Sequence, residues 1–306
     1  VYAQTERGHP RVTGFDRSVV IPVYNGMGFI EAQLDALANQ RTNLRWEVII
    51  ADNGSTDDTP HYVVSRAQAF PVPLRLVQAS GRQGASHARN VGVTAARSDL
   101  IAMCDCDDVV DTVWVDEMYQ ALQGADFIGG ALSTLHVNPD ILTSDELALP
   151  NNVQTRVGPV RELNGCNIGF RRTALLQLGG FDESYDRGAE DIDIGWRASL
   201  AGQHVTIAPR AIVLYRRRGT AVEEWGQRSR QARAYVLQRL RNSDVLIDRP
   251  SWLRTFGGVA VATMQIPRRM FSRLGRRHSS PTSLGDGERS AVCASSGPAD
   301  RFRNGS

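Results

Sequence analysis

Residues 100–110 have the sequence L-I-A-M-C-D-C-D-D-V-V, an apolar run that ends in three carboxylates. Read as a strand, this stretch alternates its side chains between two faces, which places Asp105 and Asp107 on one face and Cys104 and Cys106 on the other. Two like charges this close repel each other, and the cost is tolerable where a divalent cation lies between them and binds a phosphate. For an isolated D-x-D, a polar turn that closes a buried strand is the simpler interpretation.

The segments that precede residue 100 predict an alternation of strands and helices. Because strands that alternate with helices form parallel sheets covered on both faces, we expect an α/β fold with a mostly parallel sheet. Ligands of such sheets bind beyond the carboxyl ends of the strands, where Asn25, Asp52 and residues 105–108 are expected to meet. The spacing of apolar residues predicts strands at 18–24, 46–51 and 74–78, and helices at 29–38, up to about 69, and 85–96.

The second half of the chain contains a second cluster of acids, in the sequence R-G-A-E-D-I-D-I-G-W of residues 187–196. The apolar spacing predicts a helix that begins near Glu190 and Asp191 and ends at Gly202. Acidic residues favour the start of a helix whatever their function, but three acids in four residues exceed what capping requires. A carboxylate held there, facing the first crevice, could act as a general base towards a hydroxyl. Residues 131–162 have weak periodicity and are expected to form a variable insertion near the site.

Two other enzyme classes share parts of this pattern. A Rossmann dehydrogenase would carry G-x-G-x-x-G after the first strand, but Glu31 stands where the third glycine belongs. A phosphatase of the haloacid dehalogenase type would place D-x-D-x-V at a strand end, as residues 105–109 do. That class requires a lysine, and all 35 basic residues of this chain are arginine.

Composition limits the class of protein. The chain of 306 residues is 42% hydrophobic, enough for one large core with a smaller appendage. It contains no apolar run of about 18 residues and no apolar core of a signal peptide near its start, so we expect a cytoplasmic protein. The four cysteines lack paired spacing and are expected to be free thiols.

The motifs, taken together, resemble family 2 glycosyltransferases of GT-A fold. The resemblance covers roughly residues 18–215, and its six motifs occur in the order seen in that family. It implies a Rossmann-like, mixed but mostly parallel sheet with helices on both faces. The motifs are P-V-Y-N (22–25), A-D-N-G-S-T-D-D-T (51–59), G-x-x-x-A-R-N-x-G (84–92), D-C-D-D (105–108), F-R-R-x-A-L-x-x-x-G-G-F-D-E (170–183) and A-E-D-I-D (189–193).

The resemblance implies an inverting transferase that uses a nucleotide-diphosphate sugar. It places Pro22, Tyr24 and Asp52 against the base, Arg89 on the diphosphate side and Asp105 at the ribose. Asp107, with Asp105, would hold the Mg²⁺ or Mn²⁺ that bridges the phosphates. Asp191 would deprotonate the acceptor hydroxyl, and Glu190 would contact the acceptor or orient its loop.

The chain departs from the family at two points. Many relatives carry a histidine after the strand that follows the E-D helix, where it completes the metal site, and residues 208–218 contain none. This gap leaves a second hypothesis open, that of a nucleotide-sugar-binding protein without turnover. The glutamine-rich tryptophan motif of processive synthases is not clearly present either, which favours transfer of a single sugar in the synthesis of a cell-surface glycan, polysaccharide or glycolipid.

The C-terminal part of the chain is basic, whereas residues 1–209 are acidic. We expect a flexible arm (1–17), the transferase domain (18–215), a basic amphipathic helical region (216–277) and a disordered tail (278–306). The arginine-rich region either packs on the acidic domain or attaches to an anionic membrane surface, which would place the protein on the inner face of the cell membrane. No nucleic-acid-binding module accompanies the arginines. A glycan or a lipid-linked molecule is the expected acceptor.

Overall fold

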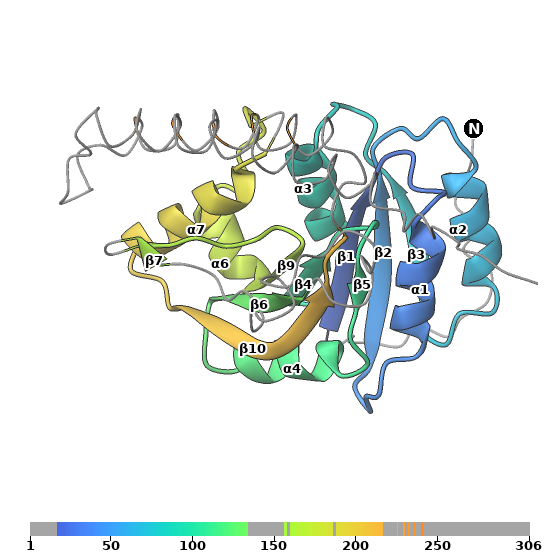
Figure 1. The fold of residues 1–306 in the computed structure, drawn as a ribbon, viewed down its shortest axis with the longest axis horizontal. Coiled ribbons are helices and arrows are strands. Elements are labelled where there is room, and N and C mark those ends of the chain that lie inside the picture. The colour runs from blue at the N-terminus through green and yellow to red at the C-terminus, as the bar shows by residue number, and fades with distance from the viewer. Residues whose placement is uncertain are drawn as a thin grey trace, which may run out of the picture. The chain divides into compact units, whose positions relative to one another are not determined.

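The structure is a computed structural model that describes residues 17–133, 156–157, 160–185 and 188–216, with single helical residues at 225, 229, 232, 236 and 240. All of them belong to the compact unit formed by residues 1–251 (Figure 1). The predicted arm except Arg17, most of the predicted insertion, most of the basic region and the tail lie outside these residues. None of the described helices is long and apolar enough to cross a membrane.

An eight-stranded sheet forms the centre of the described unit (Figure 1). Its strand order is β3-β2-β1-β4-β9-β6-β10-β5, and a separate pair is formed by β7 (Arg156–Val157) and β8 (Val160–Arg161). The strands of the sheet are β1 (Arg17–Val23), β2 (Trp46–Asp52), β3 (Leu74–Gln78), β4 (Leu100–Cys104), β5 (Val109–Val110), β6 (Phe127–Ser133), β9 (Asn167–Arg171) and β10 (Val205–Leu214).

The predicted parallel half is confirmed, and β9 reverses direction inside the sheet. β3, β2, β1 and β4 run parallel, as the alternation of strands and helices predicts. β9 pairs antiparallel with both β4 and β6, so its first residue, Asn167, lies opposite Cys104 at the end of β4. The residues just before β9 are therefore brought to the edge of the sheet where the parallel strands end.

Helices cover both faces of the sheet because the strand side chains alternate between two apolar clusters. In β1, Val19 and Ile21 face the cluster formed with α1, α2 and α4, whereas Val20 faces the cluster formed with α3, α6 and α7. The helices are α1 (Ile30–Ala38), α2 (Thr59–Ala67), α3 (Ala85–Ala95), α4 (Trp114–Leu122), α6 (Arg172–Gln177) and α7 (Glu190–Leu200).

The apolar stretch at 100–110 is two strands joined by a turn, not one strand. β4 ends at Cys104, residues 105–108 form the turn, and β5 pairs antiparallel with the end of β10. The expectation that Asp105 and Asp107 share a face by strand alternation is therefore wrong, because alternation stops where the turn begins. The buried side chain of Gln33 holds both ends of the turn: its amide donates to the Asp105 carbonyl (3.0 Å) and accepts from the Val110 amide (3.0 Å).

Candidate active site

The loops that follow β1 and β2 are locked to each other at the carboxyl edge of the sheet. Asn25 has a positive φ of 51°, and its side-chain oxygen accepts a hydrogen bond from the Thr56 amide at 2.8 Å. Asp52, the last residue of β2, is buried and accepts from the Ser55 amide at 3.1 Å. Pro22 of β1 lies in register with β2, and Tyr24, 53% exposed, follows directly. The predicted base-binding residues thus share one edge.

The turn after β4 brings three carboxylates to the same edge. The Asp105 carboxylate accepts a hydrogen bond from Arg89 at 3.1 Å. Asp108 is buried, and its Oδ1 accepts from the Arg216 amide at 2.8 Å. Its Oδ2 is also buried and has no hydrogen-bond partner among the residues that the structure describes. Burial raises the pKa of the Asp108 carboxyl well above its usual range, and the charges of Asp105 and Asp107 add to the shift.

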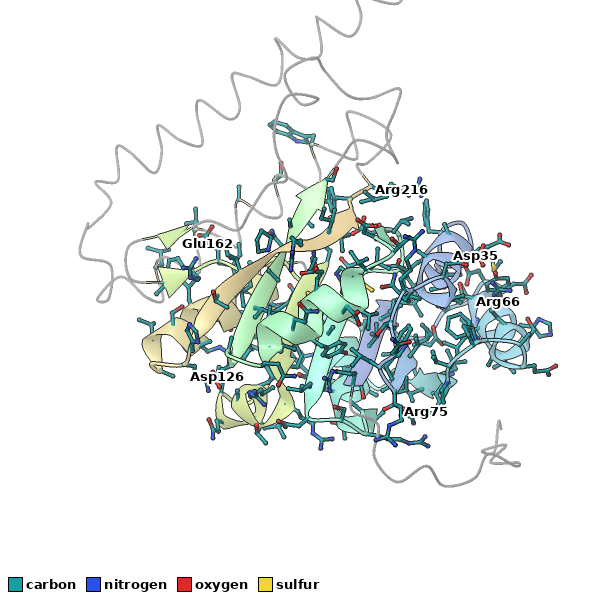
Figure 2. All side chains as sticks on the ribbon, turned by 90° about the horizontal axis from the view of Figure 1, so that it is seen from below. Asp35, Arg66, Arg75, Asp126, Glu162 and Arg216 are labelled. Carbon is teal, nitrogen blue, oxygen red and sulfur yellow. The ribbon has the colours of Figure 1, made fainter. Side chains whose placement is uncertain are left out.

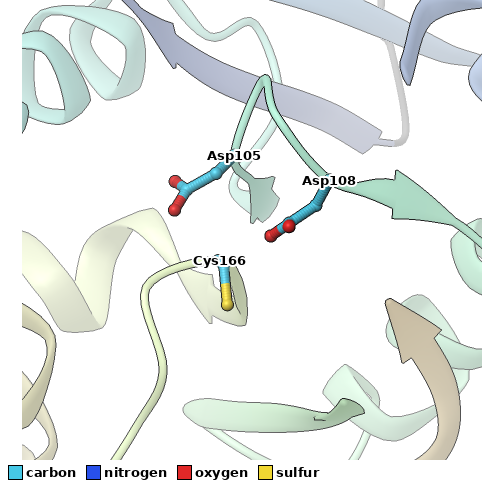
Figure 3. Close-up of side chains that lie close together, drawn as sticks. All are labelled: Asp105, Asp108 and Cys166. Atoms are coloured by element: carbon cyan, nitrogen blue, oxygen red, sulfur yellow. The ribbon is translucent and has the colours of Figure 1, made fainter. Parts of the chain in front are cut away.

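A group of three side chains in and beside this turn could hold a cation (Figure 3). Asp105, Asp108 and Cys166 offer donor atoms that all lie within 4.8 Å of one another. The unpaired buried Oδ2 of Asp108 is the observation that fits a cation best, because such an oxygen is costly without a partner. Burial raises the pKa of the Cys166 thiol, with further contributions from Asp108 and Asp105. Of the two expected metal ligands, Asp105 belongs to this group and Asp107 does not.

Arg89 on α3 connects the turn to the acidic helix. Its guanidinium is buried, donates to Asp105 and forms an ion pair with Glu190 at the start of α7. Burial alone would lower the pKa of Arg89, but the charges of Glu190 and Asp105 outweigh it and raise the pKa. Gly165 leaves room for this contact, because a Cβ built there would lie 2.7 Å from the Arg89 Nη2. The place of Arg89 on the diphosphate side of a donor stays a prediction.

Asp191 lies in the first turn of α7, as predicted, and is held by backbone donors. Its Oδ2 accepts from the Gly165 amide at 2.7 Å and its Oδ1 from the Ile192 amide at 2.9 Å. Burial, with the neighbouring charge of Glu190, raises the pKa of Asp191 to about 6. The residue before the helix, Ala189, has a left-handed φ of 75°, a strained value of the kind found at functional sites.

Several residues of the site carry no recognisable signal in the sequence. Gly165 and Cys166 precede a strand whose reversed direction only the sheet reveals. Asp108 belongs to the D-C-D-D motif, but nothing in that motif indicates that its carboxyl is buried. Gln33 occupies an ordinary position on an amphipathic helix. Arg216 lies within residues 208–218, the stretch that lacks the histidine that many relatives carry.

Two known proteins share part of the sequence with this chain. Chondroitin synthase of Escherichia coli is 25% identical over 222 residues, which make up 60% of this chain and 32% of that protein. Validoxylamine A glucosyltransferase of Streptomyces hygroscopicus is 26% identical over 224 residues, covering 62% of this chain and 53% of that protein. The chain spans a third or less of the first three relatives, whose covered shares are 32%, 22% and 23%.

Solved structures share the fold. The mannosyltransferase PcManGT from Pyrobaculum calidifontis, in complex with GDP-Man and Mn²⁺, aligns with a TM-score of 0.58 at 22% identity, over 86% of this chain and 79% of that one. Staphylococcus aureus TarS 1–349 in complex with UDP aligns with a TM-score of 0.54 at 19% identity, over 79% of each chain. The expected GT-A fold is confirmed.

Matches to family patterns cover most of the described residues. Residues 100–274 match the pattern described as glycosyl transferase family group 2. Residues 18–179, more than half of the chain, match the one described as glycosyl transferase family 2. Both matches include the turn at 105–108. The chain therefore belongs to glycosyl transferase family 2.

Proposed function

We propose that this protein transfers a sugar from a nucleotide-diphosphate sugar to an acceptor hydroxyl with inversion at the anomeric carbon. The observation that carries the proposal is the position of Asp191, a half-buried carboxyl whose pKa of about 6 lies near working pH. Arg89 links its neighbour Glu190 to Asp105, so the candidate base and the acidic turn belong to one connected site. A base matched to the pH of the cell is what proton abstraction from a hydroxyl requires.

The donor would lie along the carboxyl edge of β1, β2 and β4. Tyr24 and Pro22 would contact the base, Asp52 would accept a hydrogen bond from it, and Asp105 would face the ribose. The solved structures with UDP and with GDP-Man support a nucleotide-diphosphate sugar as the ligand class. Arg89 would lie on the diphosphate side, at the back of the site.

Asp107 and Asp105 would hold Mg²⁺ or Mn²⁺, together with Asp108 and Cys166, whose donor atoms lie close to that of Asp105. The acidic group in the turn and the Mn²⁺ of the PcManGT complex support this assignment. A bound divalent cation would neutralise the charge that develops on the departing diphosphate. Carboxylate oxygens suit both of these hard cations, whereas the Cys166 thiol suits softer metals.

The chemistry requires one proton transfer and one displacement. Asp191 would take the proton of the acceptor hydroxyl, and the resulting oxygen would attack the anomeric carbon from the face opposite the diphosphate. The bond to the diphosphate oxygen breaks as the new glycosidic bond forms, so a single displacement inverts the configuration. Glu190, held by Arg89, would orient the loop that meets the acceptor.

We further propose a role in the synthesis of a cell-surface glycan, polysaccharide or glycolipid, on the cytoplasmic side of the membrane. The polysaccharide synthases among the relatives support this class of product. The alternative, a nucleotide-sugar-binding protein without turnover, requires that Asp191 serve no reaction. Slow hydrolysis of the donor that is lost in Asp191→Asn would exclude that alternative.

A thermal-shift panel tests the proposed function. The full chain is melted with UDP-, GDP- and dTDP-sugars, with and without Mn²⁺, alongside Asp107→Asn and the control Asp35→Asn, an exposed residue paired with Arg66. A ligand that binds only the folded state must raise the melting temperature. We expect a metal-dependent rise with one nucleotide, retained in the control and lost in Asp107→Asn. The absence of any rise would contradict the proposal.

A further inference from the structure

Arg216 follows β10 and lies against the acidic turn. Its backbone amide donates to Asp108 Oδ1 at 2.8 Å, and its Nε donates to the Asp107 carbonyl at 2.9 Å. The position follows from the sheet, because Leu214 pairs antiparallel with Val109, so that the chain after β10 runs back beside the turn. Figure 2 shows Arg216 at the end of β10, at the opposite end of the sheet from Asp126.

The guanidinium of Arg216 also contacts the loop that follows β1. Its central carbon lies 5.4 Å from the centre of the Phe29 ring, a distance at which a cation is attracted to an aromatic face. Phe29 is 39% exposed and directly precedes α1. Arg216 therefore joins the loop after β1 to the turn after β4, at the edge where open α/β sheets bind their ligands.

Arg216 and Arg89 differ in the ion pairs that their guanidinium groups form within the protein. Arg89 is buried and paired with both Asp105 and Glu190, so its charge is committed within the protein. Arg216 is half-buried, and its contact with Asp107 uses one N–H and a neutral carbonyl. Among the described residues, no carboxylate forms an ion pair with Arg216, although its charge lowers the pKa of the Asp108 carboxyl, and its two Nη amino groups make no hydrogen bond.

We propose that Arg216 binds the diphosphate of the donor through these two Nη groups. The inference rests on the proposed function. In many relatives a histidine helps to hold the metal ion, and Arg216 would supply part of that positive charge beside the diphosphate. Guanidinium stays protonated at all working pH values and matches phosphate oxygens with two parallel hydrogen bonds. The Asp107 carbonyl and the Phe29 ring fix the guanidinium before the ligand arrives, which reduces the entropy lost on binding.

The same contact would assist the reaction. Negative charge grows on the diphosphate as the bond to the sugar breaks, and a fixed cation beside it lowers the energy of that state. The side chain can be changed without losing the bond to Asp108, because that bond comes from the backbone amide. Substitution of Arg216 thus tests the role of its guanidinium, while the hydrogen bond from its backbone amide to Asp108 is kept.

The test compares ligands that differ only in phosphate number. Full-length wild type, Arg216→Lys and Arg216→Met are titrated by calorimetry with the nucleoside, its monophosphate and its diphosphate, for the base that the wild type binds. We expect Arg216→Met to bind the nucleoside within about twofold of wild type and the diphosphate about tenfold to a hundredfold more weakly. The affinity of Arg216→Lys for the diphosphate should lie between those of the wild type and Arg216→Met, because lysine keeps the positive charge but cannot donate two parallel hydrogen bonds. Arg210→Met is the matched control, since Arg210 is an exposed arginine of β10, the strand that precedes Arg216, and pairs with Glu117.

Three outcomes would overturn the inference, and a fourth would contradict the proposed function on which it rests. Unchanged affinity of Arg216→Met for the diphosphate would show that the guanidinium does not contact it. An equal loss for the nucleoside and the diphosphate, or a loss of Mn²⁺ binding without nucleotide in electron paramagnetic resonance, would show that Arg216 only holds the turn. A wild type that binds none of the three ligands would contradict the proposed function itself, which is a distinguishable failure.

Discussion

The environment of Asp191 raises the pKa of its carboxyl, and this shift predicts how activity depends on pH. With the pKa raised to about 6, the carboxylate that could accept a proton is the minor form below that pH and the major form above it. We expect kcat/KM to rise about tenfold per pH unit below about 6 and to level off above it. Asp191→Asn should lower kcat/KM by at least about a hundredfold above about pH 6 and remove the dependence on pH below it, whereas Asp35→Asn should reproduce the wild-type profile. A wild-type profile that is flat between about pH 5 and 8 would contradict this role.

The same shift also changes stability with pH. The folded state binds the Asp191 proton more tightly than the unfolded state, whose carboxyl has the ordinary pKa of 3.8. Stability is therefore lost as pH rises from about 4 through about 6, and Asp191→Asn should lose less over that window than the wild type. Denaturant unfolding at several pH values measures the difference.

The sequence predicts individual site residues better than it predicts their partners. Asp191 and Glu190 can be placed in the first turn of a helix, because apolar spacing fixes where α7 begins. The ion pair between Arg89 and Glu190 joins residues that are 101 positions apart, and no local pattern encodes such a contact. The unpaired oxygen of Asp108 likewise depends on what surrounds the turn in space.

Asn167 at the start of β9 shows how one side chain can join several elements. Its Oδ1 accepts from the Trp114 indole of α4 at 2.9 Å, and its Nδ2 donates to the Ala131 carbonyl of β6 (2.8 Å) and the Ala211 carbonyl of β10 (2.9 Å). Gly130 makes room for it, because a Cβ built there would lie 2.2 Å from the Asn167 Nδ2. The buried amide thus fixes the reversed strand in the middle of the sheet.

Asn167→Ala should be strongly destabilising. The change leaves a buried N–H and two buried carbonyls without this partner, at about 1–3 kcal/mol for each unsatisfied group, so we expect a loss of about 3–5 kcal/mol in the free energy of unfolding. Urea denaturation measures it, with Asn39→Ala as the control, since Asn39 is at the C-terminal end of α1 and its amide bonds the nearby Asp35 carbonyl. A loss below about 1 kcal/mol would mean that the sheet does not depend on this amide.

The elements from β1 to β4 could be predicted because each depends on its own periodicity. β-branched runs mark the buried strands, and turn residues mark their ends. The direction of β9 could not be predicted, since a short apolar strand has the same pattern whichever way it runs. That one direction decides which residues join the turn at 105–108, so the contributions of Gly165 and Cys166 to the site could not be predicted.

The whole molecule has an uneven distribution of charge. Residues 1–209 have an excess of acids and residues 210–277 an excess of arginines, while the net charge is only +2. Trp225 and Leu240, helical residues of the basic region, are 42% and 67% exposed. Exposed apolar side chains among arginines favour attachment to an anionic membrane surface over packing on the acidic domain.

Vesicle sedimentation tests this attachment with the full chain. We expect binding to vesicles that contain anionic lipid, little binding to neutral vesicles, and release at high salt, because each arginine near the surface contributes about 1 kcal/mol that salt screens. Replacement of Trp225 and Leu240 by serine should weaken binding while donor binding in calorimetry is unchanged. Equal binding to neutral and anionic vesicles would contradict an electrostatic attachment.

The reversed direction of β9 also has a consequence for how such enzymes can change. The parallel strands β1, β2 and β4 end at the edge of the sheet that would hold the nucleotide. Because β9 runs in the opposite direction, it begins at that edge, and the segment before it reaches the same edge. We therefore expect that the part of this segment that precedes Gly165 and Cys166, the two residues that contribute to the site, can be exchanged without altering β1, β2 or β4. In evolution or in engineering, a new acceptor could be acquired by grafting that one stretch, and the recognition of the donor would be inherited intact.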